Sequence, residues 1–231
     1  MKVVILCGGA GSRLAEETQA VPKPMVEIGG RPILWHIMKL YAHHGFTEFI
    51  LCLGYKGDLI REFFLQEHGW RVVLAETGLG TPTGGRIKAI ERYVRGETFL
   101  ATYGDGVGDV RIDQLVSFHR SHRRIATVTG VHRPPQFGEM DVDGDRVVGF
   151  HEKPPVGTGW VNGGFFAFEP AVFAYLDAEI PLERGPLERL VREEQLMVFR
   201  HEGYWHHMDT IRDRQILEEQ WATGTPGWKV W

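Results

Sequence analysis

The sequence predicts an α/β fold in which helices flank a mostly parallel sheet, with a smaller β-rich elaboration in the second half. Two observations lead to this prediction. Up to about residue 131, short runs of Val, Ile and Leu alternate with segments whose apolar residues recur every three to four positions. Beyond that point, prolines and glycines separate short apolar stretches, and helical spacing returns only near the end. Strands that alternate with helices form a parallel sheet covered on both faces, which is the Rossmann-like arrangement.

Each element of the first half has its own pattern. The strands are short apolar runs that end in glycine or polar residues, as is typical of strands buried on both faces. Pro32 opens a helix with apolar residues at helical spacing, and Gly45 ends it, in keeping with the preferred places of these residues at helix ends. We expect strands at 2–7, 49–53, 71–75, 99–102 and 125–131, and helices at 32–45, 58–64, 87–94 and 112–122.

The second half is expected to elaborate the same domain. Asp143-Gly144-Asp145 lies between two short apolar stretches and predicts a hairpin turn. The segment from Asp209 to about Thr223 again has a helical pattern. Since the chain has no repeat, low-complexity segment or long linker, one domain is predicted over 1–231, with a core at 1–131, an elaboration at 132–208, and a C-terminal helix and tail at 209–231.

Charge and composition exclude several classes of protein. The net charge is −4 and the sequence pI about 6.3, with no basic stripe, so we expect no nucleic-acid partner. No apolar run approaches the roughly 20 residues that span a membrane, and the N-terminus lacks the layout of a signal peptide. Cys7 and Cys52 both lie in apolar runs and make no disulfide framework, so a cytoplasmic location is expected.

A glycine-rich segment follows the first expected strand. Gly8-Gly9-Ala10-Gly11-Ser12-Arg13 places backbone without side chains at the carboxyl end of that strand, where open parallel sheets bind ligands. Glycine lets backbone N–H groups approach an anion closely, and Arg13 adds a planar cation suited to phosphate oxygens. The segment therefore predicts either an anion site or a plain tight turn.

Two known phosphate-binding motifs were tested on this segment. The dinucleotide fingerprint G-x-G-x-x-G fits Gly9 and Gly11, but Leu14 stands where the third glycine belongs. A Walker A loop requires Gly-Lys-Ser/Thr, which is missing here. An oxidoreductase that uses NAD is therefore a poor interpretation of the chain, and a P-loop NTPase is excluded.

A second cluster favours a phosphate site. Pro22-Lys23-Pro24 holds a lysine between two prolines, which is a stiff frame for one cation. Arg13 and Lys23 together could flank one triphosphate. Each of them alone could be an ordinary surface charge, but the combination with the glycine segment indicates a nucleotide site.

Together, these motifs resemble those of a known superfamily. Gly8–Leu14 and Pro22–Met25 resemble the signature of the sugar-1-phosphate nucleotidyltransferases, and further blocks resemble the glucose-1-phosphate cytidylyltransferase family in particular. They follow the order of that family from residue 3 to about 215 and comprise 27–39, 83–88, 103–107, 152–154, 162–166 and 208–210. The resemblance implies transfer of a nucleotidyl group from a nucleoside triphosphate to a sugar 1-phosphate, with release of pyrophosphate.

The resemblance also implies the functional residues. Asp105 and Asp209 would hold Mg²⁺, a metal that prefers a few carboxylates together with phosphate oxygens and water. Arg13, Lys23 and Asp105 would carry the catalysis. In the core at 1–131, the residues that would contact the nucleotide are Leu6, Gly8, Gly9, Ala10, Gly11, Ser12, Arg13, Lys23, Thr81, Arg86 and Gly104. In the elaboration at 132–208, those that would contact the sugar phosphate are Gly138, Glu152, Lys153, Asn162 and Gly163.

The identity of the base stays open. The cytidylyltransferase pattern usually has some twenty more residues before the strand at 71–75, whereas here 63–70 connects that strand directly to the preceding helix. Such an insertion can shape both the base site and the oligomer. CTP and glucose 1-phosphate are the favoured substrates, and dTTP or UTP is the alternative to CTP. A nucleotide-sugar sensor without activity is a third interpretation, disfavoured because the cations and aspartates are all present.

The histidines and the tryptophans of the chain also have expected places. His119 and His122 are expected on a helix surface. His206-His207 lie near Asp209, where lining the site is the less favoured interpretation, and neither pair is expected to bind zinc because no cysteine or carboxylate cluster completes a tetrahedral set. Exposed tryptophans favour aggregation, so those of the tail are expected to pack against the body or against another subunit of a homo-oligomer. They are Trp221, Trp228 and Trp231.

Overall fold

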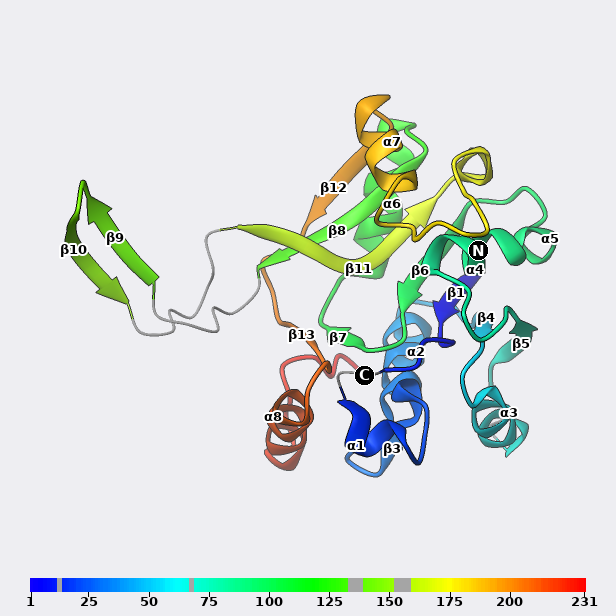
Figure 1. The fold of residues 1–231 in the computed structure, drawn as a ribbon. Coiled ribbons are helices and arrows are strands. Elements are labelled where there is room, and N and C mark those ends of the chain that lie inside the picture. Colours follow the sequence, from blue (N-terminus) through cyan, green and yellow to red (C-terminus); the bar gives the residue numbers. More distant parts are fainter. Residues whose placement is uncertain (12–13, 67–68, 133–138, 152–158) are drawn as a thin grey trace.

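A seven-stranded sheet forms the centre of the molecule (Figure 1). The computed structural model describes residues 1–11, 14–66, 69–132, 139–151 and 159–231. The order of the strands across the sheet is β12-β8-β11-β6-β1-β4-β5. All neighbours run parallel except β11, which is antiparallel to both β6 and β8, so the predicted fold class is confirmed. The strands are β1 (Val3–Leu6), β4 (Glu48–Leu53), β5 (Arg71–Glu76), β6 (Phe99–Tyr103), β8 (Ala126–His132), β11 (Trp160–Phe168) and β12 (Leu196–Arg200).

Apolar side chains bury both faces of the sheet. Successive residues of a strand point to opposite faces, so Val3 and Ile5 join one core cluster and Val4 joins the other. The first cluster receives α2 (Ile33–His43), α3 (Gly57–Gln66), α6 (Ile112–His122) and α8 (Ile211–Ala222). The second receives α4 (Thr83–Ala89), α5 (Glu91–Val94), the 3-10 helix η3 (Pro170–Ala174) and α7 (Pro186–Arg192).

The order of the strands creates a binding crevice at β1. From β1 the chain proceeds to β4 and β5 on one side, and later to β6 on the other. Where connections diverge in this way, the loops at the carboxyl ends of the two neighbouring strands separate and leave a crevice. The glycine-rich segment after β1 and Gly104-Asp105 after β6 leave the sheet at this edge.

Three small sheets complete the fold. The pairing of β7 (Gly106–Gly108) with β13 (Trp205–His207) matters most for the site, because it carries the C-terminal region to the residues that follow β6. The predicted hairpin is confirmed, with β9 (Glu139–Asp143) and β10 (Arg146–His151) joined at Gly144. The third sheet pairs β2 (Glu27–Ile28) with β3 (Arg31–Pro32), and two short helices, α1 (Ala15–Thr18) and the 3-10 helix η2 (Lys23–Met25), precede it.

Two predicted helix boundaries were wrong, and one α-helix of the elaboration was not predicted. The helix expected at 87–94 begins earlier and is divided into α4 and α5 at Ile90. The elaboration contains α7, which the sequence did not predict; Pro186 occupies its first turn, where a missing N–H costs nothing. The last helix begins at Ile211, because the Thr210 hydroxyl accepts a hydrogen bond from the Asp213 N–H and caps it.

The C-terminal tail packs against its own chain. Trp228 is fully buried, and its ring lies edge-on to His36 of α2 with centroids 4.9 Å apart. Trp221 stacks on Trp228, and Trp231 meets Trp35 of α2 at 6.4 Å. The expected packing of the tail against the body is thus confirmed.

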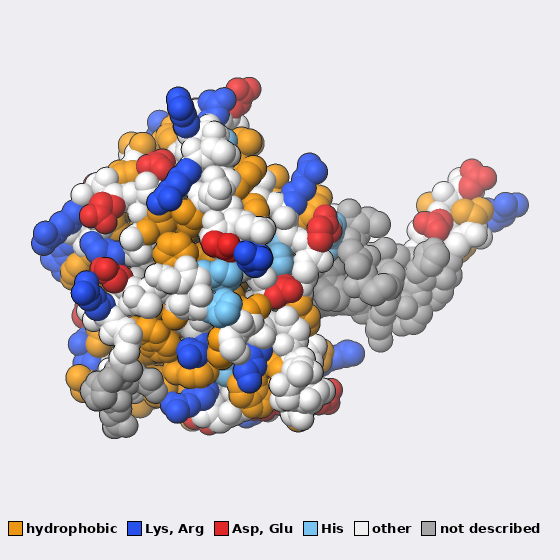
Figure 2. All heavy atoms as spheres, turned by 180° about the vertical axis from the view of Figure 1, so that it is seen from behind, with side chains coloured by type: hydrophobic (Ala, Val, Ile, Leu, Met, Phe, Trp, Pro, Cys, Tyr) orange, Lys and Arg blue, Asp and Glu red, His pale blue; other side chains and the backbone are white. Residues whose placement is uncertain are grey.

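Charge on the surface and the length of the helices complete the description of the fold. Acidic side chains are interspersed among the basic ones on the face shown in Figure 2. Within the described ranges, none of the helices is long and apolar enough to cross a membrane.

Candidate active site

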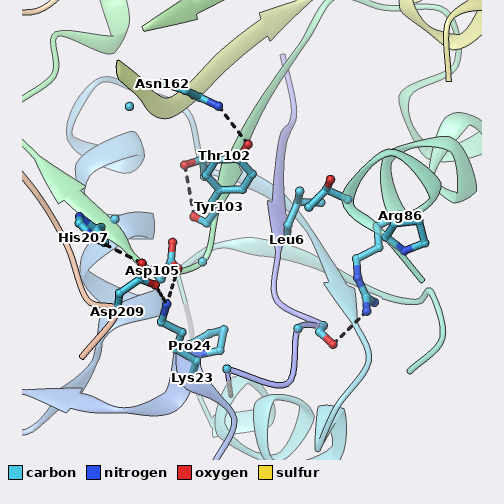
Figure 3. A pocket seen from close by; sticks show the side chains of 18 of the residues that line it. Leu6, Lys23, Pro24, Arg86, Thr102, Tyr103, Asp105, Asn162, His207 and Asp209 are labelled. Carbon is cyan, nitrogen blue, oxygen red and sulfur yellow. Dashed lines mark hydrogen bonds and ion pairs between the residues drawn. The ribbon is translucent and has the colours of Figure 1, made fainter. Parts of the chain in front are cut away.

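A cavity of about 630 Å³ opens at the crevice beside β1. Its walls come from the loops after β1 and β6, the start of α4, the first half of β11, and the β13 region (Figure 3). A volume of this size is typical of small-molecule sites. Parts of the chain that lie 200 residues apart in sequence, such as Leu6 and Asp209, therefore line one space.

Arg86 fixes the glycine-rich wall of this cavity. It lies on α4 and is 3 % exposed, and its burial lowers the pKa of the guanidinium, which stays charged because arginine has so high an ordinary pKa. The guanidinium donates to the carbonyl oxygens of Gly8 (2.9 Å), Leu53 (3.0 Å), Gly78 (2.9 Å) and Leu79 (3.3 Å) and to the Thr77 hydroxyl (2.7 Å). One buried cation thus ties together the loops that follow β1, β4 and β5.

Glycine is required where that cation meets the first loop. A Cβ added to Gly8 would lie 2.0 Å from a guanidinium nitrogen of Arg86, closer than any contact allows. A Cβ on Gly9 would meet nothing within 4 Å. Gly11 has a φ of +63°, which other residues adopt with difficulty. The three glycines therefore serve three purposes: close packing, an open surface toward the cavity, and a turn.

Lys23 lies at the centre of the cavity floor, between two carboxylates. Its Nζ is 2.6 Å from Asp105 Oδ2 and 2.5 Å from Asp209 Oδ1, and Figure 3 shows the two acidic side chains converging on it. The proline-framed η2 helix carries Lys23, and the β7–β13 pairing carries Asp209 to Asp105, helped by a hydrogen bond from the Met208 N–H to the Asp105 carbonyl (2.9 Å). Local stiffness and long-range pairing together build the cluster.

The electrostatics keep this cluster charged. Burial alone would lower the pKa of Lys23, but Asp105 and Asp209 outweigh it and raise that pKa. The hydrogen bond from His207, and then that from Lys23, hold the pKa of Asp209 well below its usual range. His207 Nε2 lies 3.3 Å from the second oxygen of Asp209. Both the lysine and this aspartate are thus ionised at neutral pH.

The same two carboxylates fit a magnesium ion that also binds phosphate. They face one point from two sides, as their shared contact with Lys23 Nζ shows. Within the described residues no group of three or more His, Cys, Asp or Glu side chains could hold a metal. Two protein oxygens with the remaining positions left to phosphate and water is the arrangement that Mg²⁺ usually adopts.

A hydrogen-bonded wall faces the glycine-rich one. The Asn162 amide of β11 donates to the Tyr103 hydroxyl (3.1 Å) and accepts from the Gly164 N–H (2.8 Å). The Trp205 indole donates to the Gly163 carbonyl (2.9 Å). Burial, together with the nearby Glu183 carboxylate, raises the pKa of Tyr103, so its phenol keeps its proton. This wall offers side-chain amide and hydroxyl groups rather than bare backbone.

The cavity gathers most of the described residues that the sequence singled out. Those that line it are Leu6, Gly8, Gly9, Gly11, Lys23, Thr81, Arg86, Gly104, Asp105, Asn162, Gly163 and Asp209. Ala10 is exposed and is not among the residues lining the cavity. The remaining predicted residues lie outside the described residues, namely Ser12, Arg13, Gly138, Glu152 and Lys153.

Sequence reasoning missed part of the site. Thr83, Tyr103, Trp205 and His207 also line the cavity. Thr83 and Tyr103 lie in blocks that carry the resemblance, and His207, which was considered as lining the site, directly precedes another, so nearness to a motif was the available signal. The expectation that His119 lies on the surface was wrong: it is 1 % exposed, since Thr127 (2.8 Å) and the Glu169 carboxylate (3.2 Å) satisfy its ring nitrogens on the inner face of α6.

Comparisons with known proteins agree with this geometry. The family model described as Nucleotidyl transferase matches residues 2–209. A glucose-1-phosphate cytidylyltransferase of Salmonella typhi is 44 % identical over 256 aligned positions that cover all of both chains, and a probable glucose-1-phosphate cytidylyltransferase of Bacillus subtilis is 42 % identical over 255 positions. Since this chain has 231 residues, both alignments contain gaps on its side.

A solved structure supports the same relationship. The crystal structure of HddC from Yersinia pseudotuberculosis complexed with GMP-PN superposes with a TM-score of 0.74 at 26 % identity, covering 95 % of this chain and 99 % of the other. The fold, the glycine-rich segment and the paired aspartates are thus accompanied by similarity along the whole sequence. The chain belongs to the nucleotidyl transferase family.

Proposed function

We propose that the chain transfers a cytidylyl group from CTP to glucose 1-phosphate, giving CDP-glucose and pyrophosphate, with Mg²⁺ as the metal. The observation that carries the proposal is the Lys23 ammonium held between Asp105 and Asp209 on the floor of a cavity whose one wall is the glycine-rich segment. The choice of CTP and glucose 1-phosphate follows the relatives that are similar over the full chain.

The reaction needs little from the protein beyond alignment and charge. A phosphate oxygen of the sugar 1-phosphate, already anionic near pH 7, attacks the α-phosphorus; the bond between the α-phosphorus and its bridging oxygen breaks, and pyrophosphate leaves with the electron pair. No general base is required. Positioning for in-line attack and neutralisation of the growing negative charge supply the acceleration.

The residues of this chain divide those tasks. The loop of Gly8, Gly9 and Gly11 offers backbone to the triphosphate, and Lys23 offers the cation nearest the cavity floor. Asp105 and Asp209 would hold Mg²⁺, which when bound screens the charge of the triphosphate. The resemblance extends nucleotide contacts to Leu6, Ala10, Ser12, Arg13, Thr81, Arg86 and Gly104.

The sugar phosphate is assigned to the opposite wall. Asn162 offers its side-chain amide there, and Gly163 lines the same wall. The resemblance adds Gly138, Glu152 and Lys153 to this set. The parts at 1–131 and 132–208 would act as one domain with the tail, because β11 lies between β6 and β8 in the same sheet.

One observation favours a second candidate for the nucleobase. Alignments longer than the chain mean that segments present in the cytidylyltransferases are missing here. A dTTP- or UTP-dependent enzyme of the same reaction type is therefore the alternative.

The two free, buried cysteines suit a cytoplasmic enzyme, and a homo-oligomer is part of the same proposal.

A crossed panel tests the proposal. Purified protein with Mg²⁺ is given CTP, dTTP, UTP, ATP or GTP together with glucose 1-phosphate, mannose 1-phosphate or galactose 1-phosphate, and pyrophosphate release is measured. We expect CTP with glucose 1-phosphate to give the highest kcat/KM, and no release without a sugar phosphate. Preference for dTTP or UTP would establish the alternative, and no turnover with any pair would contradict the proposed reaction.

A further inference from the structure

Glu183 connects three residues that line the cavity, although it does not line the cavity itself. Its carboxylate accepts a hydrogen bond from the Tyr103 hydroxyl through one oxygen and from the Thr83 hydroxyl (2.7 Å) through the other. Tyr103 in turn accepts from the Asn162 amide (3.1 Å). We propose that Glu183 is a positioning residue that orients Tyr103 and Asn162 toward the sugar phosphate, an inference that rests on the proposed function.

The direction of these hydrogen bonds fixes the orientation of each group. An ionised carboxylate can only accept, so the Tyr103 hydrogen points to Glu183 and its oxygen is free to accept. Asn162 therefore presents its NH₂ to Tyr103, while its oxygen accepts from the Gly164 N–H (2.8 Å). With both ends of the amide assigned, one N–H and one lone pair of Asn162 remain for a ligand in the cavity.

The segment that carries Glu183 is held in place by close packing on α4. A Cβ on Gly84 would lie 2.4 Å from the Ile180 carbonyl oxygen, and one on Gly85 would lie 2.2 Å from that of Ala178. The Leu182 N–H donates to the Thr83 hydroxyl (2.8 Å), and Leu182 itself is fully buried. Glu183 thus projects from a segment seated directly on the helix backbone.

Removal of the Glu183 carboxylate should therefore affect the sugar side of the cavity through Tyr103 and Asn162. Without its carboxylate, the Tyr103 hydroxyl loses its acceptor, so the direction of its O–H is no longer fixed. Its lone pair is then no longer held toward the Asn162 NH₂, and the hydrogen bond that orients the amide weakens. We expect the binding of the sugar phosphate to weaken more than that of the triphosphate.

The chain offers a matched control. Glu193 also accepts from a tyrosine hydroxyl, that of Tyr175 (2.5 Å), and from Arg189 (2.8 Å), but these residues do not line the cavity. Glu193→Ala removes the same kind of carboxylate from the same kind of partner. A general loss of stability would therefore appear in both variants, whereas an effect on the site would appear only in Glu183→Ala.

The experiment measures kcat, the KM for each substrate and the melting temperature of wild type, Glu183→Ala, Glu193→Ala, Tyr103→Phe and the Glu183→Ala/Tyr103→Phe double variant. In Glu183→Ala the KM for the sugar 1-phosphate should rise about tenfold and that for the triphosphate less than threefold, about the loss of one hydrogen bond. Tyr103→Phe should show the same pattern, the double variant no further rise, and Glu193→Ala neither.

Each other outcome overturns the inference. An unchanged KM for the sugar 1-phosphate in Glu183→Ala, an equal rise for both substrates, or effects of the two single variants that multiply in the double variant would each contradict it. The proposed function fails separately, when the wild type itself releases no pyrophosphate with any pair of substrates. An active wild type with an unaffected Glu183→Ala variant overturns the inference alone.

Discussion

The two walls of the cavity are built on opposite principles. One wall is backbone: the loops after β1, β4 and β5 converge on the buried guanidinium of Arg86, and glycines bring their carbonyls within hydrogen-bond distance of it. The other wall is made of side chains, in which Asn162 and Tyr103 are ordered through Glu183. A triphosphate is recognised by many N–H groups and cations, whereas a sugar is recognised by a few directed hydrogen bonds.

Each wall is sensitive to a different kind of substitution. The backbone wall depends on a charge buried beneath it and on the absence of side chains, so a substitution there should lower the stability of the fold. The side-chain wall depends on the direction of a short series of hydrogen bonds, so a substitution there should lower the affinity for the ligand. Lys23, Asp105 and Asp209 are instead held together by the pairing of their charges.

The largest expected effect on stability comes from Arg86→Met. The substitution removes a buried cation and leaves the carbonyls of Gly8, Leu53 and Gly78 with fewer donors, and we expect the free energy of unfolding to fall by about 3 to 5 kcal/mol. Urea unfolding measures it. Arg92→Met, an exposed arginine that bonds the neighbouring Tyr93, is the control and should change stability by less than about 0.5 kcal/mol. A small effect of Arg86→Met would show that the backbone wall holds without its cation.

The next largest effect is on the pH dependence of stability and comes from a buried histidine in α2. Burial lowers the pKa of His36 in α2 to about 4 from an ordinary value near 6.5, so the folded chain binds this proton less readily than the unfolded chain. The contribution of His36 to stability is complete above pH 6.5 and falls by about 3 kcal/mol as the pH drops from 6.5 to 4. Because the pKa of Asp209 is held low, the site cluster keeps that charge over the same interval.

Unfolding in urea at several pH values between 7 and 4 measures this loss. His36→Gln keeps a donor for the Ile28 carbonyl, which His36 Nε2 meets at 2.8 Å, and should remove the part of the loss that His36 causes. A wild type and a variant with the same pH dependence would assign the acid sensitivity to other groups.

The smallest expected effect compares two adjacent glycines. Gly8→Ala places a methyl group 2.0 Å from the Arg86 guanidinium, which has to shift, and should lower the free energy of unfolding by about 2 kcal/mol. Gly9→Ala meets open space and should leave stability within about 0.5 kcal/mol of wild type. Thermal and urea unfolding of the two variants side by side measure the difference. Equal destabilisation would contradict the requirement for close packing at Gly8.

The sequence predicted the backbone of the first half well, and physical reasons explain its limits elsewhere. Buried parallel strands and amphipathic helices such as α2 and α6 have strong periodicity, so their order was predictable. The helix α7 has seven residues, too few for a period to stand out, and was missed. The division between α4 and α5 depends on how Ile90 packs in the second core, which local propensity does not encode.

The site was predictable to the extent that motifs carry it. Lys23, Asp105 and Asp209 were recognised from the blocks that contain them, and the structure brings them together. The role of Arg86 beneath the glycine loop was missed because its partners are backbone carbonyls of distant loops. Glu183 was missed for the same reason: 80 residues separate it from Tyr103 and 100 from Thr83.

The most direct test of the account is the fate of the α-phosphorus, followed by ³¹P NMR. Wild type with CTP, glucose 1-phosphate and Mg²⁺ should produce pyrophosphate and the diphosphate signals of a nucleotide sugar in equal amounts. Asp105→Asn should do so at least about 10³-fold more slowly, while Asp113→Asn, an exposed aspartate paired with Arg111, keeps wild-type turnover. Orthophosphate in place of pyrophosphate, or near-normal turnover by Asp105→Asn, would contradict the central claim.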